Sequence, residues 1–286
     1  VWKTIGMTDS AVEWLEQYSS QSSVVQLQFK PKHSFAKLAV LLSGIAASVA
    51  FLVLNDALKT TDSLKITPLV TVFNSPVGGN RTITLSDGSD VTLAGNSSIS
   101  VYINQHARRI TLGKGSAYFD VTHDPTRIFS VTAQHTQVRV RGTAFEVKHS
   151  IDNAIKVSVQ RGLVEVADLP EQGVADEKII QLRENEQLRA NSSGAFITEV
   201  TRFNPQAEFS WLSERLIYDD IPLKTVIMDI NRYAKKPVVI LDESINDLSI
   251  TASFTFEQID QMLAGLALAY PITLIEEDTR SVLVKQ

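Results

Sequence analysis

The chain of 286 residues contains no cysteine. It can therefore form no disulfide, use no thiol as a nucleophile and build no cysteine-ligated zinc site. Its redox compartment stays open, because a chain without thiols tolerates either environment. Positive charge is also scarce, since 27 lysines and arginines against 32 aspartates and glutamates give a formal net charge of −5. A chain without a global basic field is not expected to bind duplex nucleic acid directly.

Patterns typical of metal, phosphate or hydrolytic chemistry are missing as well. The five histidines show no ligand spacing such as i, i+4, so we expect no metal site and no cofactor. No glycine-rich loop follows a strand and opens a helix, because Gly113 and Gly115 lie between predicted strands. The carboxylates are scattered, as solvated charges are, and a conventional enzyme is not expected.

One long apolar run stands out in a chain whose 44% hydrophobic content can build the cores of two or three domains. From Leu38 to Leu54, seventeen residues pass without a charge. As a helix this run would be about 25 Å long and apolar on all sides, which favours a transmembrane helix over residues 38–54. Two alternatives are a helix buried in a large core and a cleaved signal peptide, although the run continues beyond the best cleavage site.

Flanking lysines indicate an orientation for this predicted span. Lys30, Lys32 and Lys37 precede it, and Lys59 and Lys65 follow it. The small excess before the span favours an N-terminus inside the cell and a C-terminus on the other side of the membrane.

Before the span, residues 1–37 contain one amphipathic helix. Ser10 and Glu13 fit a capping box at its start. An apolar stripe follows, made of Val12, Trp14, Leu15 and Tyr18. This stripe is either part of the last helix of a truncated bundle or a face that docks on a partner. An N-terminal truncation is favoured, because the chain opens with Val1 and the helix follows almost at once.

A polar linker over residues 55–68 separates the span from residues 69–204, where apolar and polar residues alternate as in strands. The segments "ITLGKGSAYFDV" and "VSVQRGLVEV" share one form, a short strand, a basic residue with glycine, and a second short strand. Such repetition favours a β-rich domain that is either solenoid-like or sandwich-like. No segment between residues 69 and 200 has the periodicity of a helix.

A hairpin is predicted where "RTITLSDGSDVTL" alternates around Asp87-Gly88. A two-residue loop would place Leu85 opposite a charged residue. We therefore expect a three-residue loop, which sets Leu85 opposite Val91 and Ile83 opposite Leu93 and keeps the apolar side chains on one face.

After residue 204 helical spacing returns within a small α+β domain over residues 205–286. The predicted order is strand "RLIYDD", helix "IPLKTVIMDINRYAKK", strand "PVVIL", strand "LSITASF", helix "TFEQIDQMLAGLALAY", and strands "ITLIE" and "SVLVK". This is the pattern of two β-α-β halves. Trp211, just before the first strand, is expected to pack at the junction of the two domains.

Four segments together resemble the FecR-like transmembrane anti-sigma factors of Gram-negative cell-surface signalling. They are "RTITLSDGSDVTLAGNSSISV", "RRITLGKGSAYFDVTHDPTRIFSV", "VRVRGTAFEV" and "VSVQRGLVEV". The resemblance runs from about residue 75 to the end. Two places depart from the family pattern, because Asn185 and Glu214 stand where the family usually has glycine.

This resemblance implies a cytoplasmic anti-sigma segment, shortened here, an inner-membrane span, a periplasmic β-rich FecR-like domain and a C-terminal domain of the secretin and TonB N-terminal (STN) type. The implied function is a relay in which a TonB-dependent outer-membrane receptor, commonly for a ferric siderophore, signals through this protein to an extracytoplasmic-function sigma factor. Site proteases that cut the chain are further implied partners. The implied sigma-factor contacts are the four residues of the apolar stripe. The alternative is a membrane-anchored periplasmic scaffold or adaptor without a sigma-factor role.

Gly142-Thr143 is the one candidate for covalent chemistry. Some members of the resembled family cleave themselves at a Gly-Thr bond, the threonine hydroxyl attacking the preceding carbonyl, and the resemblance implies the same possibility here. Such a single-turnover reaction needs a hydroxyl beside the scissile carbonyl and a residue without a side chain in front of it. The alternative is a glycine bulge in a strand followed by a threonine that favours strands.

Overall fold

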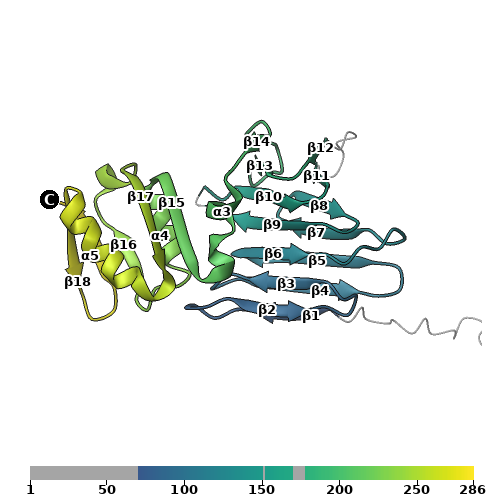
Figure 1. The fold of residues 1–286 in the computed structure, drawn as a ribbon, viewed down its shortest axis with the longest axis horizontal. Helices are drawn as coiled ribbons and strands as arrows, with labels where there is room; N and C mark the ends of the chain where they lie inside the picture. Colours follow the sequence, from purple (N-terminus) through teal and green to yellow (C-terminus); the bar gives the residue numbers. More distant parts are fainter. Residues whose placement is uncertain (1–69, 151, 170–177) are drawn as a thin grey trace, which may run out of the picture. The chain divides into compact units, whose positions relative to one another are not determined.

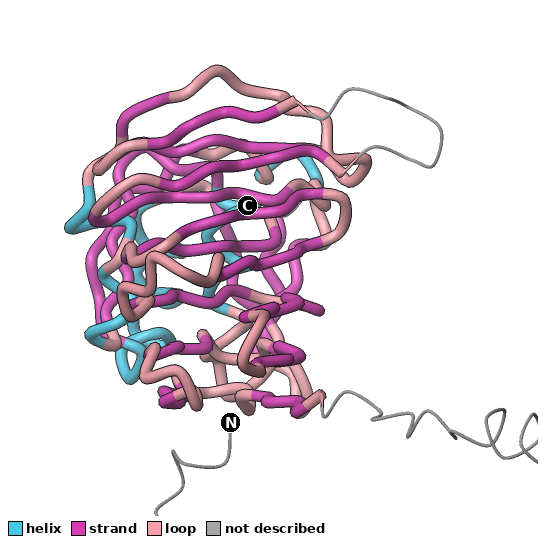
Figure 2. Tube along the Cα trace, turned by 90° about the vertical axis from the view of Figure 1, so that its right-hand side faces the viewer, coloured by secondary structure: helices cyan, strands magenta, loops and turns pink. Residues whose placement is uncertain are grey.

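The computed structural model describes residues 70–150, 152–169 and 178–286. The predicted N-terminal segment, membrane span and linker all lie outside these residues. Within the described part of the chain, no helix combines the length and the apolar character needed to cross a membrane. Strands dominate this part and helices are few, as Figure 2 shows. The fold is mainly β with some helix, as the sequence predicts.

Fourteen strands form two seven-stranded sheets (Figure 1). Sheet 1 has the order β1-β4-β5-β7-β8-β11-β12, and its strands are Thr71–Asn74, Ser98–Ile103, Arg108–Lys114, Phe129–Ala133, Thr136–Val140, Val164–Asp168 and Ile179–Leu182. Sheet 2 has the order β14-β13-β10-β9-β6-β3-β2, and its strands are Thr201–Arg202, Glu186–Ala190, Ile155–Arg161, Ala144–His149, Ser116–Asp120, Asp90–Leu93 and Arg81–Thr84. In both sheets the strand order follows the chain order, so the chain advances steadily while it crosses between the sheets.

The core of this part lies between the two sheets. Phe119 and Phe145 of sheet 2 stack with their ring centroids 5.1 Å apart, and the Phe129 ring of sheet 1 meets Phe119 edge-on at 6.0 Å. All three side chains are fully buried. Because one apolar core joins facing sheets, the arrangement is a sandwich, one of the two architectures that the sequence left open, and a solenoid is not shown.

The predicted hairpin has an odd-length loop but a different register. Ile83 pairs with Val91, and Leu85 and Ser89 close the loop through a hydrogen bond from the Leu85 amide to the Ser89 carbonyl, 2.8 Å. The predicted pairing of Leu85 with Val91 is therefore wrong by two residues. The reason is Gly88, whose positive φ of 81° places the left-handed residue at the end of a three-residue loop.

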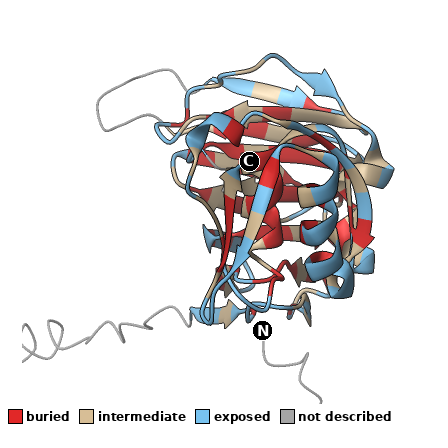
Figure 3. Cartoon of the chain, turned by 90° about the vertical axis from the view of Figure 1, so that its left-hand side faces the viewer, coloured by how far each residue is buried: buried red, intermediate tan, exposed pale blue. Residues whose placement is uncertain are grey.

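Residues 205–286 contain every helix and strand that their periodicity predicts, in the predicted order. The elements are α3 Pro205–Glu208, the 3-10 helix η2 Ser210–Ser213, β15 Arg215–Pro222, α4 Leu223–Ile230, β16 Val238–Ile240, the 3-10 helix η3 Glu243–Ile245, β17 Ser249–Thr255, the 3-10 helix η4 Phe256–Gln258, α5 Ile259–Ala269, β18 Ile272–Glu276 and β19 Ser281–Lys285. We call these elements the C-terminal module. It has an apolar core of its own, and Figure 3 shows how buried and exposed residues alternate along it.

Strands β15 and β17 pair antiparallel, and β16, β19 and β18 form a second small sheet in which β16 runs parallel to β19. Glu214 ends η2 in the left-handed conformation, with φ 56°, and Asn185 is also left-handed, with φ 63°. Both departures from the family pattern thus occupy backbone conformations that glycine adopts most easily.

Candidate functional site

Gly142 and Thr143 lie in the connection between β8 and β9, where the chain crosses from sheet 1 to sheet 2. The two residues are not inside a strand, so the alternative of a glycine bulge in a strand is wrong. The irregularity of the ladder lies instead in the neighbouring strand β10, between Val159 and Arg161. The candidate bond is therefore at a crossing point of the sandwich, with Thr143 almost fully buried.

A loop over residues 121–127 packs against this crossing. The Val121 amide donates a hydrogen bond to the Thr143 carbonyl, 2.9 Å, and the Asp124 amide donates to the Arg141 carbonyl, 2.8 Å. These two hydrogen bonds flank the candidate bond on both sides. The loop thus holds the backbone around Gly142-Thr143 from two anchoring points.

A close approach of this loop explains why residue 142 is glycine. A Cβ atom on Gly142 would lie 2.6 Å from the His123 Cα and 2.8 Å from its ring Nδ1. Both distances are shorter than real contacts, so any side chain would push the loop away. Gly142 does not have a positive φ. The requirement for glycine is therefore steric at this position and does not come from backbone strain.

The Thr143 hydroxyl forms no hydrogen bond with any described residue, and its oxygen, Oγ1, is buried. The Thr143 methyl group lies over Gly162, where a Cβ would come within 2.7 Å of it. A buried hydroxyl without a partner is costly, and few native groups are left so. This one stands next to the carbonyl that it would attack.

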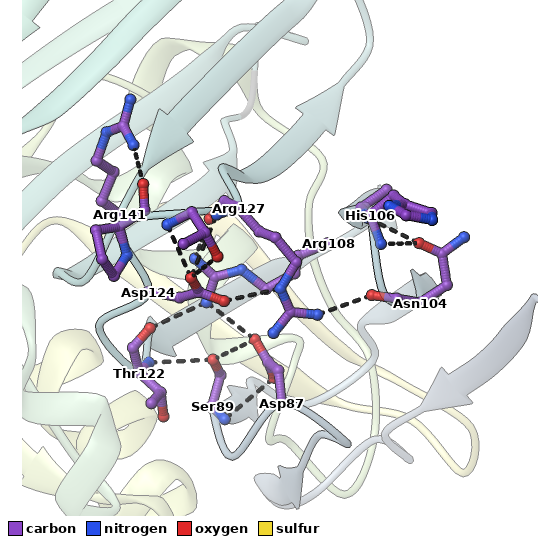
Figure 4. Close-up of polar contacts among 12 residues, drawn as sticks. Asp87, Ser89, Asn104, His106, Arg108, Thr122, Asp124, Arg127 and Arg141 are labelled. Carbon is purple, nitrogen blue, oxygen red and sulfur yellow. Dashed lines mark hydrogen bonds and ion pairs between the residues drawn. The ribbon is translucent and has the colours of Figure 1, made fainter. Parts of the chain in front are cut away.

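Beneath the loop lies a buried ion pair that the sequence analysis missed. Arg108 and Asp87 are joined at 3.2 Å, with side chains 0% and 1% exposed. The Arg108 guanidinium also donates to the Thr122 carbonyl, 3.0 Å, and to the Arg127 carbonyl, 2.5 Å, as Figure 4 shows for this group of residues. It lies over the Phe129 ring, 5.5 Å from the centroid. One arginine thus ties the hairpin loop to both ends of the 121–127 loop.

The loop is also braced from within (Figure 4). The Asp124 carboxylate accepts from the Thr126 hydroxyl, 2.6 Å, and from the Arg127 Nε, 2.7 Å. These hydrogen bonds, that of Thr126 first, hold the pKa of Asp124 well below its usual range. Arg141 donates to the Pro125 carbonyl, 2.5 Å. A signal for this cluster was present in the sequence, because Arg108 stands in phase with Ile110 on the buried face of its strand.

The four predicted sigma-factor contacts, Val12, Trp14, Leu15 and Tyr18, lie outside the described residues. Trp211 is 6% exposed, and its carbonyl accepts from the Asn80 side chain of the sandwich, 2.7 Å. Trp211 therefore packs at the junction, as the sequence predicts. Among the residues of the three described segments, no group of three or more histidine, aspartate or glutamate side chains could hold a metal ion.

Next to this junction lies a cavity of about 490 Å³ between sheet 2 and the C-terminal module. Charged and polar side chains from both parts line it, among them Glu146, Lys148, Lys156, Glu208, Tyr218 and Asp229. Acidic and basic residues line the cavity in equal number. No single sign of charge marks it as a site for an anion or a cation.

Comparisons with known proteins agree over both described parts. The family model described as "FecR protein" matches residues 71–165, and the model "FecR, C-terminal" matches residues 215–284. Two crystal structures, at 2.50 and 1.65 Å resolution, are of a protein from Parabacteroides distasonis that is provisionally assigned as an anti-sigma factor. Each is 26% identical to this chain with a TM-score of 0.65, and the match covers 76% of this chain and 100% and 99% of the other. A comparison with curated proteins found no match.

Proposed function

Because the chain belongs to the FecR-like anti-sigma factors, we propose that it relays a periplasmic signal across the inner membrane to an extracytoplasmic-function sigma factor. The observation that supports this most is the order of the two family matches, one on the sandwich and one on the C-terminal module. A solved relative with the same two parts is covered over its full length.

In this proposal the N-terminal segment is cytoplasmic and carries the sigma factor, with Val12, Trp14, Leu15 and Tyr18 as contacts. Residues 38–54 cross the inner membrane once, and the sandwich and C-terminal module are periplasmic. The signal comes from the periplasmic domain of a TonB-dependent receptor that takes up a ferric siderophore. The apolar run and the lysines before it support this topology.

Two measurements test the relay. In the first, spheroplasts carrying a C-terminally tagged chain are treated with protease. Loss of the tag supports a periplasmic C-terminus, and a protected tag overturns the topology. In the second, the full chain is captured from detergent-solubilised membranes. Recovery of a sigma factor that is lost on Leu15→Asp supports the relay. Recovery of envelope components without a sigma factor, in wild type and variant alike, supports the adaptor alternative.

We also propose one turn of self-cleavage at Gly142-Thr143. Thr143 Oγ1 attacks the Gly142 carbonyl carbon, the C–N bond breaks, and the hydroxyl proton passes to the freed amine of Thr143. The resulting ester is hydrolysed by water, which leaves a carboxylate on Gly142 and restores the threonine hydroxyl. The free Oγ1 and the anchored loop support this step.

The test of self-cleavage compares Thr143→Ala and Thr143→Ser in the full chain. Alanine should leave one full-length species, whereas serine keeps a hydroxyl and should still yield two fragments. Thr136→Ala is the matched control, because Thr136 Oγ1 is also buried without a described partner but follows no glycine. Cleavage that persists in Thr143→Ala would overturn the mechanism.

A further inference from the structure

The outer face of sheet 2 is polar where the C-terminal module covers it. On β9, Phe145 and Val147 enter the sandwich core, so the residues between and after them, Glu146 and Lys148, point to the opposite face. The register extends this face to the neighbouring strands, with Ser158 opposite Glu146. The remaining cross-strand partners on this face are Tyr118 opposite Glu146, and Ser116 and Lys156 opposite Lys148.

Ion pairs join this face to the module. Lys148 Nζ lies 2.7 Å from an Asp229 carboxylate oxygen on α4. Lys156 pairs with Glu208 on α3, and the Ser158 hydroxyl also donates to Glu208, 2.9 Å. Each of these two carboxylates thus has a lysine of its own. These ion pairs add to apolar contacts between sandwich and module, in which Ala94 and Tyr118 of the sandwich pack with the apolar core of the module.

The carboxylate of Glu146, unlike those of Asp229 and Glu208, has no lysine partner among the described residues. It is 2% exposed, and in the described structure it forms no ion pair and accepts one side-chain hydrogen bond, from Ser116. A buried carboxylate without a cation of its own is unfavourable in the charged form. Burial, reinforced by the nearby charge of Glu208, accordingly raises the pKa of Glu146 to about 7.

Charged and titratable groups reach this region from every element around it. Those of the sandwich are Tyr118 on β6, Lys148 on β9, Lys156 on β10 and Arg202 on β14; those of the module are Glu208 on α3, Tyr218 and Asp219 on β15, Asp229 on α4, and Arg232 and Tyr233 after it. Both lysines already have a carboxylate partner. A charged Glu146 therefore lies near the negative charge of Glu208, and this repulsion adds to the cost of burying it.

We propose that the C-terminal module docks on sheet 2 in a proton-linked manner, and that Glu146 takes up the proton when the module covers it. An undocked Glu146 would stand on the open face of the sheet, where water solvates the carboxylate. Docking therefore favours the protonated form, and by linkage protonation favours docking. The contact tightens as pH falls below 7 and loosens as pH rises. The proposal does not depend on which sigma factor or receptor the protein uses.

Hydrogen exchange of the full chain in detergent, followed by mass spectrometry, measures this docking directly. The Gly78 amide donates to the Arg232 carbonyl across the junction, 3.0 Å, so a peptide over residues 76–80 reports on undocking. A peptide from β9 reports on the sandwich itself. After correction for the intrinsic exchange rate, protection at Gly78 should fall about 30-fold between pH 5.5 and 8, while β9 stays protected.

Variants separate Glu146 from other causes. Glu146→Gln removes the titration, so protection at Gly78 should lose its pH dependence. Ser116→Ala removes the hydrogen bond that favours the charged form, and should move the transition to higher pH. Glu165→Gln, on β11 of the other sheet, is the matched control and should behave as the wild type. Wild-type protection that does not vary with pH, or a pH dependence that survives in Glu146→Gln with β9 still protected, would overturn the proposal. If Glu146→Gln does not fold, the shift in Ser116→Ala decides, and its absence counts against the proposal.

Discussion

Breaking the ion pair between Arg108 and Asp87 should destabilise the sandwich strongly. Asp87→Asn keeps the size of the side chain but leaves Arg108 as a buried charge without a counter-ion. Such a change typically costs 3–5 kcal/mol. Arg108 keeps the Thr122 and Arg127 carbonyls and the Phe129 ring as partners. We therefore expect the lower end, a loss of about 3 kcal/mol in the free energy of unfolding.

For a chain of this size that loss corresponds to a fall of roughly 6–12 °C in Tm. Arg108→Met should cost a similar amount, because Asp87 is then the unpaired buried charge and, among the described residues, retains only Ser89 as a donor. The double variant removes both charges. Its cost should be smaller than the sum of the single costs by about 1–3 kcal/mol, the coupling expected for residues in contact.

The assay is thermal and urea unfolding of the full chain in detergent, followed by circular dichroism. Asp152→Asn is the matched control, because it breaks an ion pair with Arg189 whose side chains are 48% and 36% exposed. That pair should be worth no more than about 1 kcal/mol. Single costs that add within about 0.5 kcal/mol, or a loss in Asp87→Asn no larger than in the control, would refute the reasoning.

Three further changes have defined outcomes. Gly95→Ala should lower the free energy of unfolding by about 1–3 kcal/mol, because its Cβ would lie 2.2 Å from the Arg232 carbonyl oxygen. Gly79→Ala is the control in the same unfolding assay and should be near neutral, because its Cβ would meet nothing within 4 Å. Glu214→Gly should raise Tm. The strain of a left-handed non-glycine residue costs about 1–2 kcal/mol, and its removal outweighs the conformational entropy that glycine adds to the unfolded chain. An unchanged or lower Tm would contradict this. The free energy of unfolding of the wild type, taken relative to Glu146→Gln, should fall by up to about 3 kcal/mol as pH rises from 4.5 to 7, because Glu146 binds a proton in the folded state that it has lost in the unfolded one. The lowered pKa of His149 acts in the opposite direction but is common to both chains, and a difference that does not vary with pH would contradict the raised pKa of Glu146.

Local periodicity was sufficient to predict the elements of the described chain. The alternation in residues 69–204 predicts strands, and strands such as β5, β7 and β8 show it in their burial. Helical spacing in residues 223–230 and 259–269 predicts α4 and α5. These patterns can be read from the sequence because a side chain repeats on one face at a period set by its own backbone.

The same reasoning could not predict the register in which strands pair. Parity places Ile83 and Leu85 on the buried face, but a shift of two residues preserves parity, so alternation cannot distinguish one pairing from the next. The left-handed conformation of Gly88 decides it. The candidate bond shows the same limit. Its residues were evident in the motif, whereas the close approach of His123 that requires Gly142 was not.

The sequence by itself determined the strand and helix order, the apolar run, the hydroxyl beside a glycine, and the ordered motifs that indicate the family. Only the tertiary structure decided which charges meet. Lys148 and Asp229 stand 81 positions apart and Arg108 and Asp87 stand 21 apart, and nothing in a local period relates residues at such distances. Burial likewise belongs to the whole fold. Glu146 lies on the polar face of β9, and its burial in the folded chain, with the charge of Glu208 nearby, raises its pKa.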